Sequence, residues 1–152
     1  MTEDFAESNR KVEALTAPRN VVLVGASDRP GSWPERVWQN VSRYDFKGNI
    51  YLINPRREEL WGRRCYPNFA SLPESPDHLA VLVPAPSVVS VLREAAAAGA
   101  RSATVYGTGF GESHDAKGQE LGQQLDAVIR ETGIALSGPN CMGNVCGMSR
   151  LV

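Results

Sequence analysis

Residues 21–35 constrain the fold of this chain more than any other stretch. The four apolar residues 21–24 are typical of a strand covered on both faces of a sheet, and Gly25 follows where the backbone must turn sharply. A helix start comes next, because Ser32 and Glu35 have the spacing of a capping box. Free N–H groups and the helix dipole favour negative charge at such a helix start. The stretch therefore predicts a phosphate-binding turn.

The rest of the chain alternates short apolar runs with amphipathic segments. The apolar runs lack polar–apolar alternation, so we expect helices to cover both faces of the sheet. The runs that predict strands lie at 20–26, 49–55, 78–84, 102–106 and 134–137. The segments that predict helices lie at 33–44, 86–99 and 114–132. This pattern is typical of the α/β class, here as a Rossmann-like, doubly wound, mainly parallel five-stranded sheet with helices on both faces.

One domain accounts for most of the 152 residues. Residues 1–18 predict a lead-in helix, residues 19–147 the domain itself, and residues 148–152 a tail that leads to a further domain. Between the second and third predicted strands, residues 60–77 carry several prolines. They predict an irregular connection with one helical turn at 68–72.

Charge and apolar content exclude several classes of function. The chain has 16 basic and 17 acidic residues and a net charge of −1, which argues against nucleic acid as a partner. No apolar run approaches the roughly 20 residues of a membrane helix, and the first residues are acidic rather than signal-like. We therefore expect a cytoplasmic protein without a membrane partner. The three cysteines lack the spacing and partners of a metal site, so no metal is expected.

The turn after the first predicted strand departs from the dinucleotide fingerprint G-x-G-x-x-G. Ser27 stands where the middle glycine belongs, and Gly31 comes one place late. Residues 54–57 read Asn-Pro-Arg-Arg, without the acidic residue by which NAD binders hold a ribose hydroxyl. Two guanidiniums there suit a ribose that carries a phosphate, which favours NADP or coenzyme A. The alternative is a solvated pair balanced by Glu58 and Glu59.

Four ordered motifs carry a resemblance to a known family. They are Gly25-Ala26-Ser27 with Gly31-Ser32, Asn54-Pro55, Val83-Pro84-Ala85-Pro86, and Gly138-Pro139-Asn140-Cys141-Met142-Gly143. Over about residues 16–147, the chain resembles the N-terminal CoA-binding domain of the NDP-forming (ADP-forming) acyl-CoA synthetases, which are related to the succinyl-CoA synthetase alpha subunit. The resemblance implies coenzyme A, or an acyl-CoA, as the ligand.

The resemblance also implies which residues line the CoA site. Residues 27–32 would lie at the phosphates, Arg56 or Arg57 near the ribose phosphate, and residues 84–86 along the adenine or pantetheine. The loop that follows the fourth predicted strand and Asn140 would lie near the thiol end. In full, the implied CoA-binding residues are Gly25, Ser27, Arg29, Gly31, Ser32, Asn54, Pro55, Arg56, Arg57, Val83, Pro84, Ala85, Pro86, Thr108, Gly109 and Asn140.

The family's full reaction implies further parts. It interconverts acyl-CoA, ADP and phosphate with the free acid, CoA and ATP through a phosphorylated histidine that belongs to the following domain. Neither His78 nor His114, which is expected at an exposed helix start, matches that histidine's motif. This chain is therefore expected to bind CoA without catalysis of its own, with the remaining domains or subunits of the ligase as partners. Two alternatives stay open: an NADP- or NAD-binding redox or nucleotide-sensing module on the same fold, and an interaction domain without a ligand.

Several single residues have their own interpretations. Trp33 either stacks on a ligand base or packs the helix start on the sheet. Trp38 and Tyr44 lie on the apolar stripe of their predicted helix and are expected in the core. Asp28 faces solvent or caps a turn, since a carboxylate suits a phosphate loop poorly. Cys141 is expected to be a small turn residue rather than a nucleophile.

Overall fold

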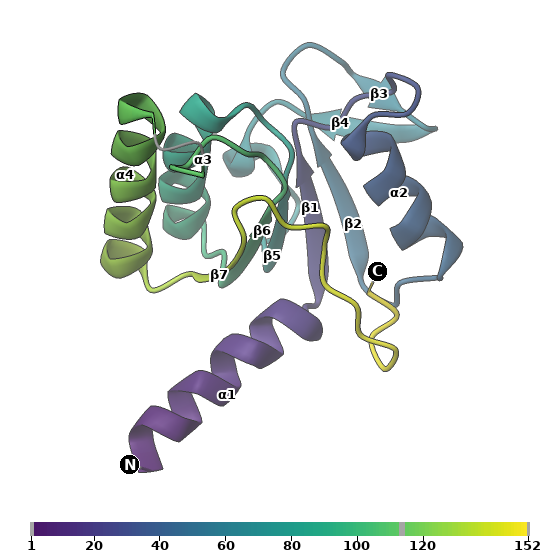
Figure 1. The fold of residues 1–152 in the computed structure, drawn as a ribbon. Coiled ribbons are helices and arrows are strands. Elements are labelled where there is room, and N and C mark those ends of the chain that lie inside the picture. The colour runs from purple at the N-terminus through teal and green to yellow at the C-terminus, as the bar shows by residue number, and fades with distance from the viewer. Residues whose placement is uncertain (1, 113–114, 152) are drawn as a thin grey trace.

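Parallel strands flanked by helices make up the structure, as the apolar runs predict (Figure 1). The computed structural model describes residues 2–112 and 115–151. The helices are α1 (Thr2–Thr16), α2 (Trp33–Arg43), α3 (Ala85–Ala97) and α4 (Ala116–Thr132), with a 3-10 turn η1 (Phe69–Ser71). The strands are β1 (Asn20–Val24), β2 (Asn49–Ile53), β3 (Glu59–Leu60), β4 (Arg63–Tyr66), β5 (His78–Val81), β6 (Ser102–Val105) and β7 (Ala135–Ser137). No helix in the described part of the chain is long and apolar enough to span a membrane.

The order of the strands explains where a ligand site can lie. It is β3-β4-β2-β1-β5-β6-β7, and every neighbouring pair except β3–β4 is parallel. β1 lies in the middle, where Val24 faces Ile53 of β2 on one side and Val81 of β5 on the other. The chain thus winds outward from β1 in both directions, and the switch between the two directions lies between β1 and β5. This arrangement confirms the Rossmann-like, doubly wound class.

The sheet has seven strands rather than the five that the apolar runs predict. The two additional strands, β3 and β4, overlap the stretch expected to be an irregular connection. β4 extends the sheet beyond β2, with Leu52 facing Cys65 and Ile53 facing Tyr66. Pairing with the exposed edge of β2 makes Arg63–Tyr66 a strand, although this segment contains no apolar run. The predicted helical turn at 68–72 is present as η1.

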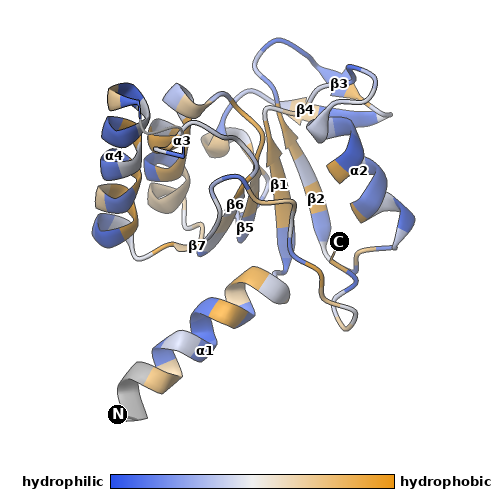
Figure 2. Cartoon of the chain, viewed as in Figure 1, coloured by the Kyte–Doolittle hydropathy of each residue, from blue (hydrophilic) through white to orange (hydrophobic). Residues whose placement is uncertain are grey.

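The core has two layers, one on each face of the sheet. Val22 and Val24 of β1 pack on the side of α3 and α4, whereas Val21 and Leu23 pack on the side of α2. Figure 2 shows that α3 and α4 turn apolar stripes towards the sheet and polar stripes outward. Burial on both faces is the physical reason why the strands read as continuous apolar runs.

Helix α2 buries a narrower stripe than its sequence predicts. Val37 and Val41 are buried, and Trp38 is partly buried against Trp61, with ring centroids 5.1 Å apart and planes inclined by 3°. Tyr44 is 46% exposed, so its placement in the core was wrong. The helix ends at the preceding residue, so the helical periodicity that would carry Tyr44 inward stops before it.

Helix α1 projects from the body of the domain, and only its last turns contact the sheet (Figure 1). Ala14 is buried at this contact. The C-terminal segment 138–151 returns across the sheet towards the same place, where Ser149 Oγ donates to the Thr16 carbonyl at 2.6 Å. Leu151 is buried on the α2 side of the sheet. The end of α1 is therefore held by residues from the far end of the chain.

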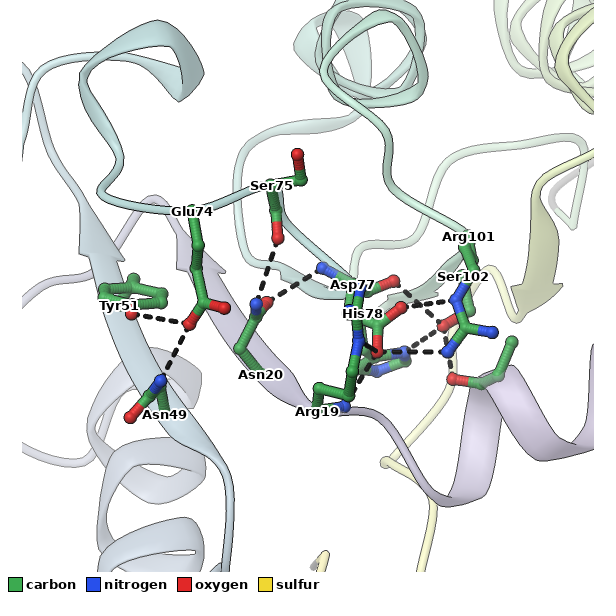
Figure 3. A network of polar contacts seen from close by, with 11 residues as sticks. Arg19, Asn20, Asn49, Tyr51, Glu74, Ser75, Asp77, His78, Arg101 and Ser102 are labelled. Carbon is green, nitrogen blue, oxygen red and sulfur yellow. Dashed lines mark hydrogen bonds and ion pairs between the residues drawn. The ribbon is translucent and has the colours of Figure 1, made fainter.

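A polar network lies at the amino edge of the sheet (Figure 3). The Asp77 carboxylate, which is 1% exposed, accepts hydrogen bonds from the Arg19 backbone N–H at 2.7 Å and from the Arg101 guanidinium at 2.5 and 3.1 Å. Asn20 braces the same turn: its amide donates to the Ser75 carbonyl at 3.0 Å, and its side-chain oxygen accepts from the Asp77 N–H at 2.8 Å. Burial opposes the charge on Asp77. The hydrogen bonds from Arg101 and Arg19 outweigh burial and hold the pKa of this carboxyl below its usual value.

His78 is buried beside Asp77 and is held by two hydroxyl groups. Ser102 Oγ donates to the Ala14 carbonyl at 2.5 Å and lies 2.8 Å from His78 Nδ1. Since the Ser102 proton is used on Ala14, His78 Nδ1 is the donor, and Nε2 accepts from Thr104 Oγ1 at 3.2 Å. This arrangement assigns a neutral imidazole. Burial lowers the pKa of His78 to about 4, although the charge of Asp77 opposes the shift.

Candidate functional site

The loops that follow the parallel strands meet at the carboxyl edge of the sheet. Two of them are in close contact at the switch point, where Gly25 follows β1 and residues 82–83 follow β5. A Cβ added to Gly25 would lie 2.9 Å from Val83 Cγ1 and 3.1 Å from the Leu82 carbonyl, and the residue has φ +87°. Only glycine suits both this backbone conformation and this space. Two of the implied site residues, Gly25 and Val83, are thus direct neighbours.

We expect Gly25→Ala to lower the free energy of unfolding by about 2–3 kcal/mol, and Gly31→Ala by about 1 kcal/mol. Gly31 also has a positive φ of +72°, but no atom lies within 4 Å of an added Cβ, so its variant reports the backbone conformation alone. Urea unfolding of both variants measures the difference. Equal losses would contradict a steric role for the contact with Val83.

Asn54 ties the loop after β2 to the loop after β1. Its backbone N–H donates to the Tyr66 carbonyl at 3.1 Å, and its side-chain amide donates to the Ala26 carbonyl at 2.8 Å. Its side-chain oxygen accepts from the Arg56 N–H at 2.8 Å. Both the nitrogen and the oxygen of the Asn54 side chain are thus bonded to backbone groups, which makes Asn54 a positioning residue for this loop.

An ion pair crosses between the same two loops. Asp28 Oδ1 lies 3.3 Å from Arg57 Nη2, and each side chain is about half exposed. Such an exposed pair contributes well below about 1 kcal/mol to stability, but it orients Arg57 towards the loop after β1. Asp28 is therefore an ion-pair partner, and Arg57 is balanced by Asp28 rather than by Glu58 or Glu59.

The start of α2 differs from the predicted capping box. The Glu35 carboxylate accepts from the Gly31 N–H at 2.6 Å, and the N-cap Ser32 makes no side-chain hydrogen bond to the helix. The loop turns tightly here, with the Ser32 N–H donating to the Arg29 carbonyl at 3.1 Å, so Glu35 reaches the loop instead of the cap. Ser32 is 8% exposed, and its Oγ is buried without a hydrogen-bond partner in the described part of the chain. This hydroxyl lies at the start of α2, where the N–H groups of Trp33 and Glu35 have no acceptor within the helix and Pro34 has no N–H.

Ser27 and Arg29 lie within the turn itself. Ser27 Oγ accepts from the Arg29 N–H at 3.3 Å, so the turn is braced by its own groups. The Arg29 side chain is exposed. A positive side chain and a buried hydroxyl, Ser32 Oγ, thus flank the start of α2.

The loops after β5 and β6 lie against each other. Pro84 is the N-cap of α3, and Ala85 and Pro86 form its first turn. A Cβ added to Gly109, in the loop after β6, would lie 3.6 Å from Ala85 Cβ. The Glu112 carboxylate accepts from the Gly109 N–H at 3.0 Å and shapes this loop.

The loop after β7 joins the same edge. The Asn140 N–H donates to the Gly107 carbonyl at 2.9 Å, which places Asn140 beside the residue that precedes Thr108. The side chains of Thr108 and Asn140 are exposed. Cys141 is half-buried, and its Sγ lies 3.3 Å from Ser137 Oγ, a contact expected of a small turn residue.

Trp33 is the first residue of α2 and is partly exposed to solvent. Its ring centroid lies 5.8 Å from that of Tyr106, which follows β6, with planes inclined by 44°. The Arg36 guanidinium lies 5.7 Å from the Trp33 centroid, and Trp33 is 41% exposed. Burial raises the pKa of Tyr106 to about 12, so this phenol stays neutral. Trp33 thus packs against the loop after β6 and still presents a free surface.

An open hollow of about 730 Å³ lies beyond the ends of β2 and β4. Its lining residues are Asn54, Pro55, Arg56, Arg57, Glu58, Glu59, Arg64, Cys65 and Pro67. Its volume lies within the range of about 300–1,000 Å³ typical of small-molecule sites. Arg64 and Cys65 come from β4 and are absent from the sequence-based set. The pair Arg63-Arg64 after Gly62 was the available signal, but without β4 nothing assigned it to this edge.

The implied site residues therefore lie along one edge in two linked groups. Contacts join the loops after β1, β2 and β5, and further contacts join the loops after β5, β6 and β7. His78 lies at the amino edge, outside both groups. His114 lies outside the described residues.

Comparisons with known proteins agree on the kind of domain. A family model described as a CoA binding domain matches residues 19–146. Trans-feruloyl-CoA synthase FCS1 from an unknown prokaryotic organism is 36% identical over 136 residues, which are 90% of this chain and 19% of that protein. The alpha subunit of ADP-forming acetate–CoA ligase I from Pyrococcus furiosus is 32% identical over 144 residues, which are 92% of this chain and 31% of that subunit.

A solved structure shares the same fold. It is the dinucleotide-forming acetyl-coenzyme A synthetase 1 of Ca. Korarchaeum cryptofilum in complex with phosphate and ADP, with a TM-score of 0.84 and 33% sequence identity. The match covers 92% of this chain and 30% of that chain. The chain thus spans between about a fifth and a third of the length of the proteins it matches.

Proposed function

The chain belongs to the CoA binding domain family, and from this premise we propose that it holds coenzyme A, or an acyl-CoA, along the carboxyl edge of its sheet. In this proposal it is the CoA-binding part of an ADP-forming acyl-CoA ligase. The observation that carries the proposal is the meeting of the motif-bearing loops after β1, β2 and β5 beside the switch point between β1 and β5, with the fourth motif farther along the same edge. Ligands of doubly wound sheets bind at this point.

The residues at this edge fit a ligand with several phosphates. Ser32 Oγ is buried without a partner beside the start of α2, and a phosphate oxygen would satisfy it together with the first-turn N–H groups. Arg29 adds a positive charge next to that position. Gly25 lets the backbone of the loop after β1 lie directly on the loop after β5. The pyrophosphate of CoA is accordingly assigned to residues 27–32.

The rest of the ligand follows the edge away from this turn. The hollow beside Arg56 would take the phosphorylated ribose, and residues 84–86 would lie along the adenine or pantetheine. Thr108, Gly109 and Asn140 would lie near the thiol end, since the loop of Gly109 lies against Ala85 at the start of α3 and the Asn140 N–H is bonded to Gly107 in that loop. Asn54 acts through the backbone that it positions.

In the proposed ligase this chain binds CoA, and other domains or subunits carry out the chemistry. His78 is 3% exposed and has both ring nitrogens occupied by hydroxyl groups, which makes it unsuited to accept a phosphoryl group. The overall reaction would interconvert acyl-CoA, ADP and phosphate with the free acid, CoA and ATP. The matched proteins, three to five times longer than this chain, have room for the remaining parts.

Thermal unfolding with a panel of ligands tests the proposal. CoA or acetyl-CoA at 100 times its dissociation constant is expected to add about 2.7 kcal/mol of stability, which for a domain of this size raises Tm by about 5–10 °C. NAD and NADP at the same concentrations are expected to leave Tm unchanged. Stabilisation by NADP alone would instead favour a redox or nucleotide-sensing module. A Tm that none of the four ligands changes would favour an interaction domain.

A further inference from the structure

Three arginines, Arg56, Arg57 and Arg64, line the hollow beyond β2 and β4, and they differ in whether an ion pair already engages them. Arg57 is already paired with Asp28 across the two loops. Within residues 2–112 and 115–151, neither Arg56 nor Arg64 forms an ion pair. The carboxylates of Glu58 and Glu59 line the same hollow, yet in the described structure neither forms an ion pair with Arg56 or Arg64.

The backbone of β4 fixes the position of Arg64. Cys65 faces Leu52 in the parallel pairing with β2, and Arg64 faces Glu59 in the antiparallel pairing with β3. Strand geometry places Arg64 and Tyr66 on one face of the sheet and Arg63 on the other. Pairing on both sides makes β4 an inner strand of the sheet, so Arg64 is carried by a rigid element rather than by a loop.

Two aromatic contacts separate the roles of the neighbouring arginines. The Arg64 guanidinium lies 5.1 Å from the Tyr66 ring centroid and lines the hollow. The Arg63 guanidinium lies 5.5 Å from the Trp38 ring on the α2 side and does not line it. Stacking on Tyr66 holds the planar guanidinium of Arg64 in place without using its N–H donors. Those donors remain available for a ligand.

We infer that Arg64 and Arg56 together bind the ribose phosphate of the ligand, while Arg57 is a positioning residue that joins two loops through Asp28. The inference rests on the proposed function and assigns the phosphate to a pair that the sequence does not single out. A phosphate monoester carries a charge of about −1.5 to −2 at neutral pH and accepts paired hydrogen bonds from guanidiniums. Two unpaired arginines from a strand and a loop match that charge. Arg64 thereby determines the preference for the phosphorylated ribose.

Calorimetric titration of Arg64→Gln with CoA and with 3′-dephospho-CoA tests this assignment. Loss of one charge-assisted contact is expected to weaken CoA binding by about tenfold or more and to leave 3′-dephospho-CoA binding unchanged. Arg63→Gln is the matched control, because it removes the same charge from the adjacent residue on the opposite face of β4. We expect it to bind both ligands as the parent chain does.

The possible outcomes separate this inference from the proposed function. Failure of the parent chain to bind CoA would overturn the proposed function, and the inference with it. Binding of CoA by the parent with equal losses for both ligands in Arg64→Gln, or with no loss, would overturn the inference alone. An equal effect of Arg63→Gln on CoA would show that general positive charge, rather than Arg64 itself, attracts the ligand.

Discussion

Replacing Asp77 by alanine is expected to lower the free energy of unfolding by about 3 kcal/mol, because hydrogen bonds to a charged group contribute about 1.5–3 kcal/mol each. The carboxylate is buried and joins the Arg19 backbone N–H to the Arg101 guanidinium, at the turn where α1 meets β1. Removing it leaves the Arg19 backbone N–H and the Arg101 guanidinium without this acceptor. Urea unfolding followed by circular dichroism measures the loss.

Two further variants define what the Asp77 result means. Asp77→Asn keeps an acceptor for the Arg19 N–H but removes the charge, so we expect it to lose about half as much stability. Asp28→Ala removes a carboxylate whose ion pair with Arg57 is half exposed, and it is expected to cost less than about 1 kcal/mol. A loss in Asp77→Ala no larger than that of Asp28→Ala would contradict the structural role of the buried carboxylate.

Lowering the pH from about 6.5 to 4 is expected to reduce the stability of the chain by about 3 kcal/mol through His78 alone. Burial lowers the pKa of His78 in the folded state to about 4, whereas the unfolded chain binds this proton near pH 6.5. Between these values the unfolded state holds more protons, so acid favours unfolding. The stability is fully present above pH 6.5 and is lost as the pH falls towards the folded pKa.

Urea midpoints at half-unit steps of pH measure this slope. His78→Gln is expected to flatten the profile above pH 4.5, where carboxyl groups contribute little, and both proteins carry His114→Gln so that no second imidazole titrates. Below about pH 4 the Asp77 carboxyl, whose pKa is held below its usual value, adds a further loss in both proteins. A profile that keeps its slope between pH 6.5 and 4.5 in His78→Gln would assign the effect to other groups.

The sequence predicts well those elements whose burial requires a recognisable run or spacing of apolar residues. Residues 21–24 and 78–81 are covered on both faces and therefore read as apolar runs. Helix α4 ends at Thr132, and its C-cap Gly133 takes a left-handed conformation with φ +68°. These signals are local, and the alternation of strands and helices predicts a parallel sheet with helices on both faces.

What the sequence does not predict depends on contacts between distant segments. β4 contains two arginines and becomes a strand by pairing with β2, and its turn of Trp61 and Gly62 lacks the Asn-Gly signature of a two-residue hairpin. The ion pair between Asp28 and Arg57 joins loops that become neighbours only through the strand order. The same holds for Arg64, because β4 alone brings it to the hollow.

The central position of β1 sets an order of events during synthesis. β1 precedes in the chain both strands that it pairs with, residues 49–53 on one side and 78–81 on the other, so one of its edges stays unpaired until residue 81 has left the ribosome. The end of helix α1 gains its contacts later still, because its last residues accept hydrogen bonds from Ser102 and Ser149. Contacts of such sequence separation form slowly. The end of α1 is therefore fixed only after residues 102 and 149 have been made, and β1 exposes an unpaired apolar edge until residue 81 has been made.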